Sequence, residues 1–174
     1  MARKKSSSGL GPATAHGAPL REFARSLPMS LLRAREAVMR QFRPSLRANG
    51  LTEQQWRILR ALSSVESIEV TELARLAFLL GPSLSRILRD LEARQLVERK
   101  TAEADQRRAV VSISAKGIKL IELVAPTSEA IYQEITRRYG VDRLAELQGM
   151  LGMLEQNLAR IAGREAIDAD AAEE

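Results

Sequence analysis

Short polar side chains and arginines are combined in residues 81–108 in a pattern suited to reading nucleic acid. The stretch is GPSLSRILRDLEARQLVERKTAEADQRR. The arginine fork matches guanine in the major groove, and small side chains let a backbone approach the bases. The residues that meet this requirement are Ser83, Ser85, Arg86 and Arg89. We therefore expect these four side chains to contact bases and nearby phosphates of double-stranded DNA.

A second basic group closes the same stretch, in a turn-rich segment. Here Asp105 precedes Arg107 and Arg108. A narrow minor groove holds a strong negative potential that attracts arginine. The sequence predicts that Asp105 orients one of the two guanidinium groups while the other enters the groove, and we include all three residues in the DNA-binding set.

Two short helices are needed to position the first group. After Pro82, which suits a first helical position, apolar residues recur at helical spacing at Leu84, Ile87, Leu88 and Leu91. A preceding amphipathic helix is predicted within residues 67–79 and is broken by Gly81 and Pro82. Two short helices joined by a tight turn that contains glycine form a helix-turn-helix.

A hairpin is predicted to carry the second group. Residues 96–100 and 109–114 alternate like strands, and the eight residues 101–108 connect them. A helix-turn-helix followed by such a hairpin is a winged helix.

Further helices are predicted before this unit. One runs from Ser30, which can cap it, to about residue 48, with Pro44 bending it or ending it early. The next lies within residues 51–64, where Thr52 and Gln55 have the spacing of a capping box.

Long helices are predicted after the hairpin. Residues 116–139 are helical in pattern, with an expected kink at Pro126, and Gly140 ends them. An apolar heptad pattern then follows at Leu144, Leu147, Leu151, Leu154, Leu158 and Ile161. A helix with this pattern requires a partner helix. The predicted fold class is mainly α, with a small β-hairpin wing.

Composition excludes several kinds of chemistry. The chain has no cysteine and one histidine, His16, so thiol catalysis, cysteine-ligated zinc, a histidine triad and a multi-histidine metal site are not expected. We predict no catalytic residue, no metal and no enzyme. The formal charge of +5 suggests a polyanionic partner. No apolar run approaches the roughly 20 residues of a membrane span, so we expect a cytoplasmic protein without a membrane partner.

Three residues are candidates for binding a small molecule. Arg35 falls within the apolar stripe of the first predicted helix, and Gln55 and Trp56 fall together on the second. Together they could hold a carboxylate and stack an aromatic ring. The alternatives are that Arg35 reaches the surface or pairs with an acid, and that Trp56 only anchors the core.

The motifs now assembled resemble a known family. Residues 105–117, DQRRAVVSISAKG, resemble the D-x-R-(S/R)-x-x-V-x-(L/I)-(T/S)-x-x-G signature of the MarR family of bacterial winged helix-turn-helix regulators. Residues 32–39 (LRAREAVM), 42–44 (FRP), 51–58 (LTEQQWRI) and 82–84 (PSL) are similar to the branch that includes homoprotocatechuate-operon regulators. The resemblance covers about residues 30–161.

The resemblance implies a homodimer that binds a pseudo-palindromic operator, with Arg107 in the minor groove. It also implies release by a small aromatic or heteroaromatic acid, no bound cofactor, and control of aromatic catabolism. Repression is the expected mode, although activation is left open because the sign depends on where the operator lies. The alternative from a different class is a non-enzymatic adaptor that uses a winged helix to bind protein.

The resulting domain prediction has five parts. Residues 1–28 form a disordered basic leader, with the alternative of an arm that touches DNA. Residues 29–50 and 117–164 form a helical dimerisation region. Residues 51–116 form the winged helix-turn-helix domain, and 165–174 form an acidic disordered tail.

Overall fold

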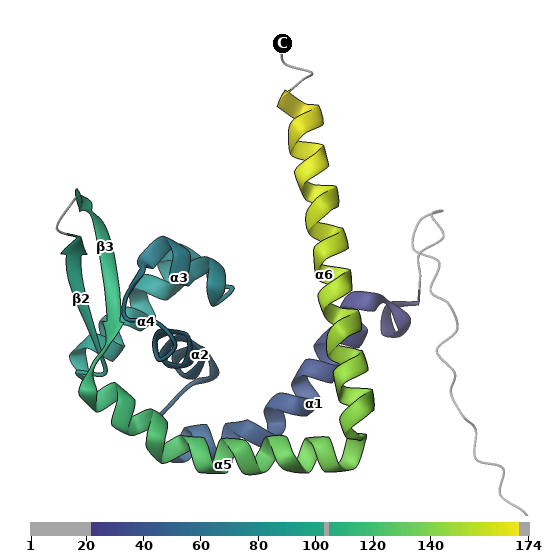
Figure 1. Ribbon diagram of the computed structural model, residues 1–174, viewed down its shortest axis with the longest axis horizontal. Coiled ribbons are helices and arrows are strands. Elements are labelled where there is room, and N and C mark those ends of the chain that lie inside the picture. The colour runs from purple at the N-terminus through teal and green to yellow at the C-terminus, as the bar shows by residue number, and fades with distance from the viewer. Residues whose placement is uncertain (1–21, 103–104, 171–174) are drawn as a thin grey trace, which may run out of the picture. The chain divides into compact units, whose positions relative to one another are not determined.

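Helices make up most of the computed structural model, which describes residues 22–102 and 105–170, with side chains for 22–100 and 109–159. In these ranges the β structure is one small antiparallel sheet (Figure 1). The predicted fold class, mainly α with a small β wing, is confirmed. Two compact units follow one another along the chain, and the second begins at Ser45. The elements in order are η1 Phe23–Arg25, α1 Leu27–Ala48, α2 Glu53–Leu62, β1 Ile68–Glu69, α3 Val70–Leu76, α4 Gly81–Ala93, β2 Val97–Ala102, β3 Asp105–Ile113, α5 Ala115–Tyr139 and α6 Val141–Asp170.

The first helix begins three residues earlier than predicted and ends, as predicted, at Ala48. It begins at Leu27, and Ser30 lies inside it, where its backbone N–H donates to the Ser26 carbonyl at 3.0 Å. Ser30 is therefore not the cap. Pro44 does not end the helix, which continues to Ala48. A proline removes only its own N–H from the helical ladder, so the residues after it can still bond to the preceding turn.

The predicted leader is also partly structured. Residues 22–28 include the 3-10 turn η1 and the start of α1. Residues 1–21, with His16, lie outside the described part of the chain.

The core of the second unit is built from leucine and isoleucine of three helices. The capping box of α2 is present: Thr52 Oγ1 accepts from the Gln55 N–H at 3.2 Å, and Gln55 Oε1 accepts from the Thr52 N–H at 2.8 Å. Helices α2, α3 and α4 lie beside the β2–β3 hairpin (Figure 1) and contribute fully buried side chains to this core. These side chains are Ile58, Leu59, Leu62, Leu73, Leu84, Leu88 and Leu91.

The sheet has a strand that the sequence did not predict. Its order is β1-β3-β2, and Ile68 of β1 pairs with Val111 of β3. A strand of two residues has no alternation of its own, so only its partner defines it. The β2–β3 hairpin is also longer than predicted, because Ala102 pairs with Asp105. The assignment of residues 101–108 to one connection is therefore wrong: strand pairing uses backbone groups, and it extends into polar residues here.

Helix α5 starts at a tight junction with the hairpin. Ser114 Oγ accepts from the Gly117 N–H at 3.0 Å and donates to the Gln95 carbonyl at 2.7 Å. A Cβ on Gly117 would lie 2.2 Å from the Leu96 carbonyl oxygen, so only glycine fits this approach. The junction fixes the start of α5 against the root of β2.

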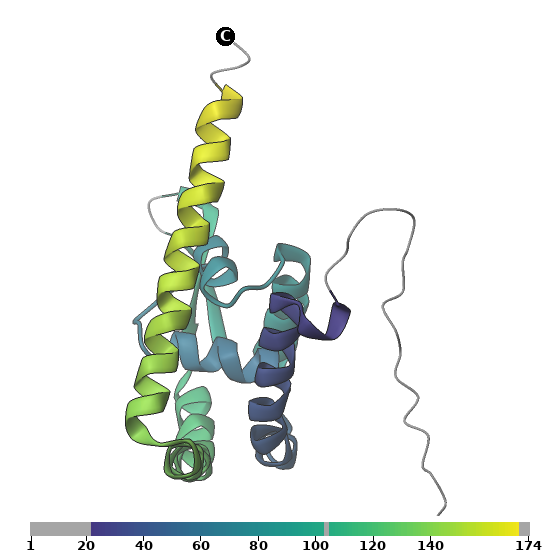
Figure 2. The same cartoon turned by 90° about the vertical axis from the view of Figure 1, so that its right-hand side faces the viewer.

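The last helix begins at a glycine and runs further than predicted. Gly140, with φ of +97°, ends α5, and α6 turns away from it there (Figures 1 and 2). Helix α6 continues to Asp170, beyond the predicted boundary at residue 165. Residues 164–170 contain neither proline nor glycine, the two residues that most strongly oppose a helix. No helix in the described ranges has the length and apolar character needed to cross a membrane.

Candidate nucleic-acid interface

Helix α4 separates its apolar and polar residues between two faces. Leu84, Leu88 and Leu91 are fully buried and hold α4 against the rest of the second unit, while Ile87 is half-buried. The predicted DNA-contacting side chains lie on the outer side, with Ser85 half-buried and the rest exposed: Ser83, Arg86 and Arg89. The structure thus brings these predicted residues together on one helix.

The two arginines of this face are little engaged by the protein. Within the described residues Arg86 has no hydrogen bond or ion pair, and Arg89 Nε makes a long contact of 3.4 Å to the Ser85 carbonyl. Both guanidinium groups can therefore donate to an outside acceptor without breaking a strong internal contact.

Asp90, on the same helix, does have partners within the protein. Asp90 Oδ2 accepts from Gln55 Nε2 at 2.7 Å and lies 3.6 Å from Arg94 Nη1. These contacts tie α4 to α2 and occupy the carboxylate. Gln55, predicted to bind a small molecule, is thus engaged by both Thr52 and Asp90.

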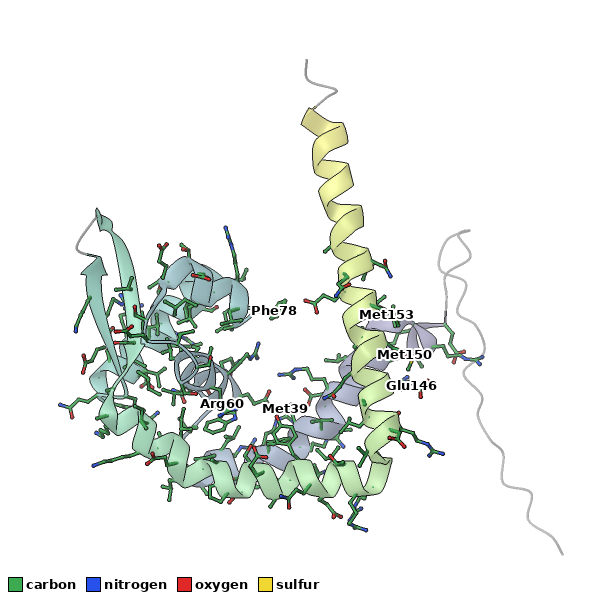
Figure 3. All side chains as sticks on the ribbon, in the orientation of Figure 1. Met39, Arg60, Phe78, Glu146, Met150 and Met153 are labelled. Atoms are coloured by element: carbon green, nitrogen blue, oxygen red, sulfur yellow. The ribbon has the colours of Figure 1, made fainter. Side chains whose placement is uncertain are left out.

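A further contact that the sequence reading did not find supports the start of α4. Arg57 Nη1 donates to the Ala77 carbonyl at 2.7 Å, directly after α3. The next residue, Phe78, has φ of +50° and is 79% exposed (Figure 3). Arg57 therefore holds the turn between α3 and α4 in place.

The wing is joined to the reading helix by an ion pair. Arg99 Nε of β2 lies 3.6 Å from Glu92 Oε1 of α4. Asp105, Arg107 and Arg108 belong to β3, which Asp105 opens. Their side chains lie outside the described set, so their predicted roles at the minor groove stay predictions.

The small-molecule candidates fall in separate units. Arg35 belongs to the first, where its side chain is 46% exposed and pairs with Glu36 at 3.0 Å. Glu36 also pairs with Arg43 at 2.6 Å. Arg35 is therefore not a buried cation, because its stripe is itself exposed in the single chain, as Leu31 and Val38 show. Pairing with an acid was the alternative left open.

Helix α2 of the second unit offers an aromatic and cationic pair. Trp56 is half-buried, and the guanidinium carbon of the exposed Arg60 lies 6.0 Å from the ring centroid of Trp56. The sequence reading did not single out Arg60, although its spacing of four residues from Trp56 places both on one face. No cluster of three or more potential metal ligands occurs among the described residues.

Comparisons with known proteins identify the family to which this fold belongs. A model of the MarR family matches residues 49–108, which include α2, α3, α4 and β2. The HTH-type transcriptional regulator FarR of Neisseria gonorrhoeae is 37% identical over 129 residues, which is 74% of this chain and 88% of that protein. The chain belongs to the MarR family.

Other MarR-like relatives agree with the predicted branch. The homoprotocatechuate degradative operon repressor of Escherichia coli is 37% identical over 126 residues, covering 72% of this chain and 85% of that protein. The crystal structure of NadR in complex with 4-hydroxyphenylacetate is 36% identical, with a TM-score of 0.69, and the match covers 79% of this chain and 97% of NadR. The predicted resemblance is confirmed, and the protein is a DNA-binding transcriptional regulator of the MarR family.

Proposed function

We propose that this protein is a homodimeric repressor that binds a pseudo-palindromic operator and releases it when a small aromatic carboxylate binds. The observation that carries the proposal is the outer face of α4. Within the described residues Arg86 has no partner and Arg89 has only the long contact to Ser85, while leucines on the opposite face hold the helix firmly. Rigid support matters because a base contact requires the guanidinium at a fixed distance and angle.

The proposed division of labour assigns one groove to each element. Ser83, Ser85, Arg86 and Arg89 contact bases and phosphates in the major groove. Arg107 enters the adjacent minor groove, with Asp105 orienting it and Arg108 adding charge. The Arg99–Glu92 ion pair supports this arrangement, because it links the strand that leads into the wing to the reading helix.

Pairing of two chains is supported by α6. Leu151 and Leu158 of its heptad pattern are 41% and 52% exposed in the single chain. An exposed apolar stripe on a long helix is stabilised by a partner helix. A dimer would present two reading helices, as needed for half-sites about 34 Å apart.

The aromatic effector is supported by two relatives and by one pair of residues. NadR has been crystallised with 4-hydroxyphenylacetate, and another relative is named for the homoprotocatechuate degradative operon. In this chain, Trp56 can stack on a ring and Arg60 can pair with a carboxylate. Arg35 and Gln55 remain candidates for the same role, although Gln55 already bonds Asp90.

The test starts from the full-length protein and a pool of random double-stranded DNA. Enrichment should yield an inverted repeat, and binding to it should weaken steeply as salt is raised. Added 4-hydroxyphenylacetate should release the DNA, whereas 2-(4-hydroxyphenyl)ethanol, which lacks the carboxylate, should not. Failure to enrich any sequence at low salt would remove the operator proposal. Release by neither compound, nor by any member of a panel of aromatic and heteroaromatic acids, would remove the effector proposal alone.

Two substitutions separate the candidate effector residues. Arg60→Gln and Arg35→Ala should each leave operator affinity unchanged but raise the effector concentration needed for release. Whichever variant still releases DNA at the wild-type concentration loses its residue from the proposed site.

A further inference from the structure

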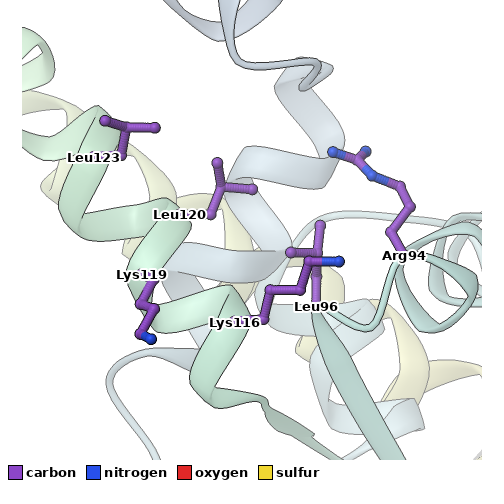
Figure 4. A pocket seen from close by; sticks show the side chains of 6 residues that line it. All are labelled: Arg94, Leu96, Lys116, Lys119, Leu120 and Leu123. Carbon is purple, nitrogen blue, oxygen red and sulfur yellow. The ribbon is translucent and has the colours of Figure 1, made fainter.

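A second site is suggested by a groove with a cavity volume of about 450 Å³ on the second unit. Six side chains line it, and they come from the end of α4, the root of β2 and the first turns of α5 (Figure 4). They are Arg94, Leu96, Lys116, Lys119, Leu120 and Leu123. None of them belongs to the proposed DNA-binding or aromatic-effector sets.

The basic side of this groove is not balanced by acids of the protein. Within the described residues, Lys116 and Lys119 have no ion pair or hydrogen bond, and the first turn of α5 contains no acid. The positive end of a helix dipole is an unfavourable place for lysine. An anion bound beside Lys116 would relieve that repulsion and pair with its ammonium group, which extends beside Leu96, whereas Lys119 points away from it (Figure 4).

Arg94 adds a cation whose position is already set. It follows α4, and its guanidinium lies 3.6 Å from Asp90. Because Asp90 partly neutralises it, Lys116 is the main attraction for an anion, and Arg94 is a second cation of the lining.

The apolar side of the groove is aliphatic. Leu96 is 3% exposed, Leu120 is half-buried, and Leu123 is 66% exposed. Figure 4 shows Leu120 and Leu123 along one side of α5, with Lys116 extending beside Leu96. The lining contains no aromatic ring, in contrast to the Trp56–Arg60 pair, so it suits an alkyl chain better than a stacked ring.

We propose that this groove binds an aliphatic carboxylate, with its alkyl chain on Leu96, Leu120 and Leu123 and its carboxylate at Lys116. Burying the chain would remove the exposed surface of Leu123 from water, and each methylene buried contributes about 0.8 kcal/mol in general. The proposal does not depend on DNA binding, and its test contains no DNA.

The test is calorimetric titration of the full-length protein with sodium octanoate, with thermal unfolding as a second readout. Octanoate should bind at one saturable site per chain and raise the unfolding midpoint. Octylammonium has the same chain with the opposite charge and should not bind. Butyrate, with a shorter chain, should bind at least about tenfold more weakly, since two or more methylenes leave the groove.

Variants locate the site. Lys116→Gln should weaken octanoate binding about tenfold or more. Leu123→Asn should also weaken it, and because Leu123 is exposed this change leaves folding intact. Lys100→Gln, an exposed lysine outside the groove, is the matched control.

Three results would overturn the proposal. They are wild-type affinity in both groove variants, equal binding of octanoate and octylammonium, and binding that does not saturate. Competition between octanoate and 4-hydroxyphenylacetate would be a fourth such result, because the two ligands would then share one site.

Discussion

Helices α2 and α4 bury similar apolar residues, yet the partners of Gln55 and Arg57 on α2 differ from those of Arg86 and Arg89 on α4. On α2, Gln55 bonds Thr52 and Asp90, and Arg57 bonds the Ala77 carbonyl. On α4, Arg86 has no partner among the described residues, and Arg89 has only a long contact within its own helix. Residue type alone does not distinguish the two cases. Side chains with strong hydrogen bonds inside the protein hold the domain together, whereas side chains without them are available to an outside partner.

This comparison predicts that substitutions on the two helices have different consequences. Changes at Gln55 or Arg57 of α2 should lower the free energy of unfolding, and changes at Arg86 or Arg89 of α4 should lower DNA affinity without that loss. Three places should differ in how much stability a substitution removes: the junction at Gly117, the Arg57 contact on α2, and Glu134 at the end of α5.

The largest loss of stability should come from the junction between the hairpin and α5. Gly117→Ala places a Cβ 2.2 Å from the Leu96 carbonyl, so backbone must shift, and we expect the free energy of unfolding to fall by about 3–5 kcal/mol. Gly149→Ala is the matched control, because no heavy atom lies within 4 Å of its Cβ, and it should gain about 0.5–1 kcal/mol. Denaturant unfolding measures both. Equal effects of the two changes would show that the junction is not tightly packed.

Arg57→Ala should have the next largest effect. It removes a hydrogen bond from a charged group to the Ala77 carbonyl, and such bonds contribute about 1.5–3 kcal/mol. Arg60→Ala on the same helix is the control: its side chain is exposed, so unfolding should be nearly unchanged. If both variants unfolded at the wild-type denaturant concentration, the Arg57 hydrogen bond would not stabilise the domain, and the proposed difference between α2 and α4 would fail.

The smallest effect should occur at the end of α5, where arginines are engaged as on α2. Hydrogen bonds from Arg137 and Arg138 lower the pKa of Glu134 from 4.5 to about 2. A lowered carboxyl pKa stabilises the fold above pH 4.5, and this contribution is lost as the pH falls towards 2. Glu134→Gln should therefore lower the unfolding midpoint slightly at pH 7, with the difference from wild type shrinking below pH 4.5. A difference that stays constant down to pH 2.5 would contradict this.

The sequence predicted best those features that depend on neighbours along the chain. Pro82 with Leu84, Leu88 and Leu91 defined α4, and Thr52 with Gln55 defined the start of α2. Both patterns repeat within one or two helical turns, so local spacing contains the information.

What the sequence did not predict depends on partners far along the chain. Gln55 meets Asp90, which lies 35 residues away, and Arg57 meets Ala77, 20 residues away. Strand β1 exists only because β3 pairs with it. Reading periodicity could place each residue on a face, but it could not tell which polar side chains the folded domain would engage.

The central claim is that Arg86 and Arg89 of α4 read DNA. The most direct test is the affinity of Arg86→Ala and Arg89→Ala for the selected operator, measured beside their unfolding free energies. We predict a loss of about 1–3 kcal/mol of binding for each arginine that contacts a guanine, relaxed base preference at the contacted position, and unchanged stability. Wild-type operator affinity in both variants would contradict the claim, as would a loss of stability equal to the loss of binding.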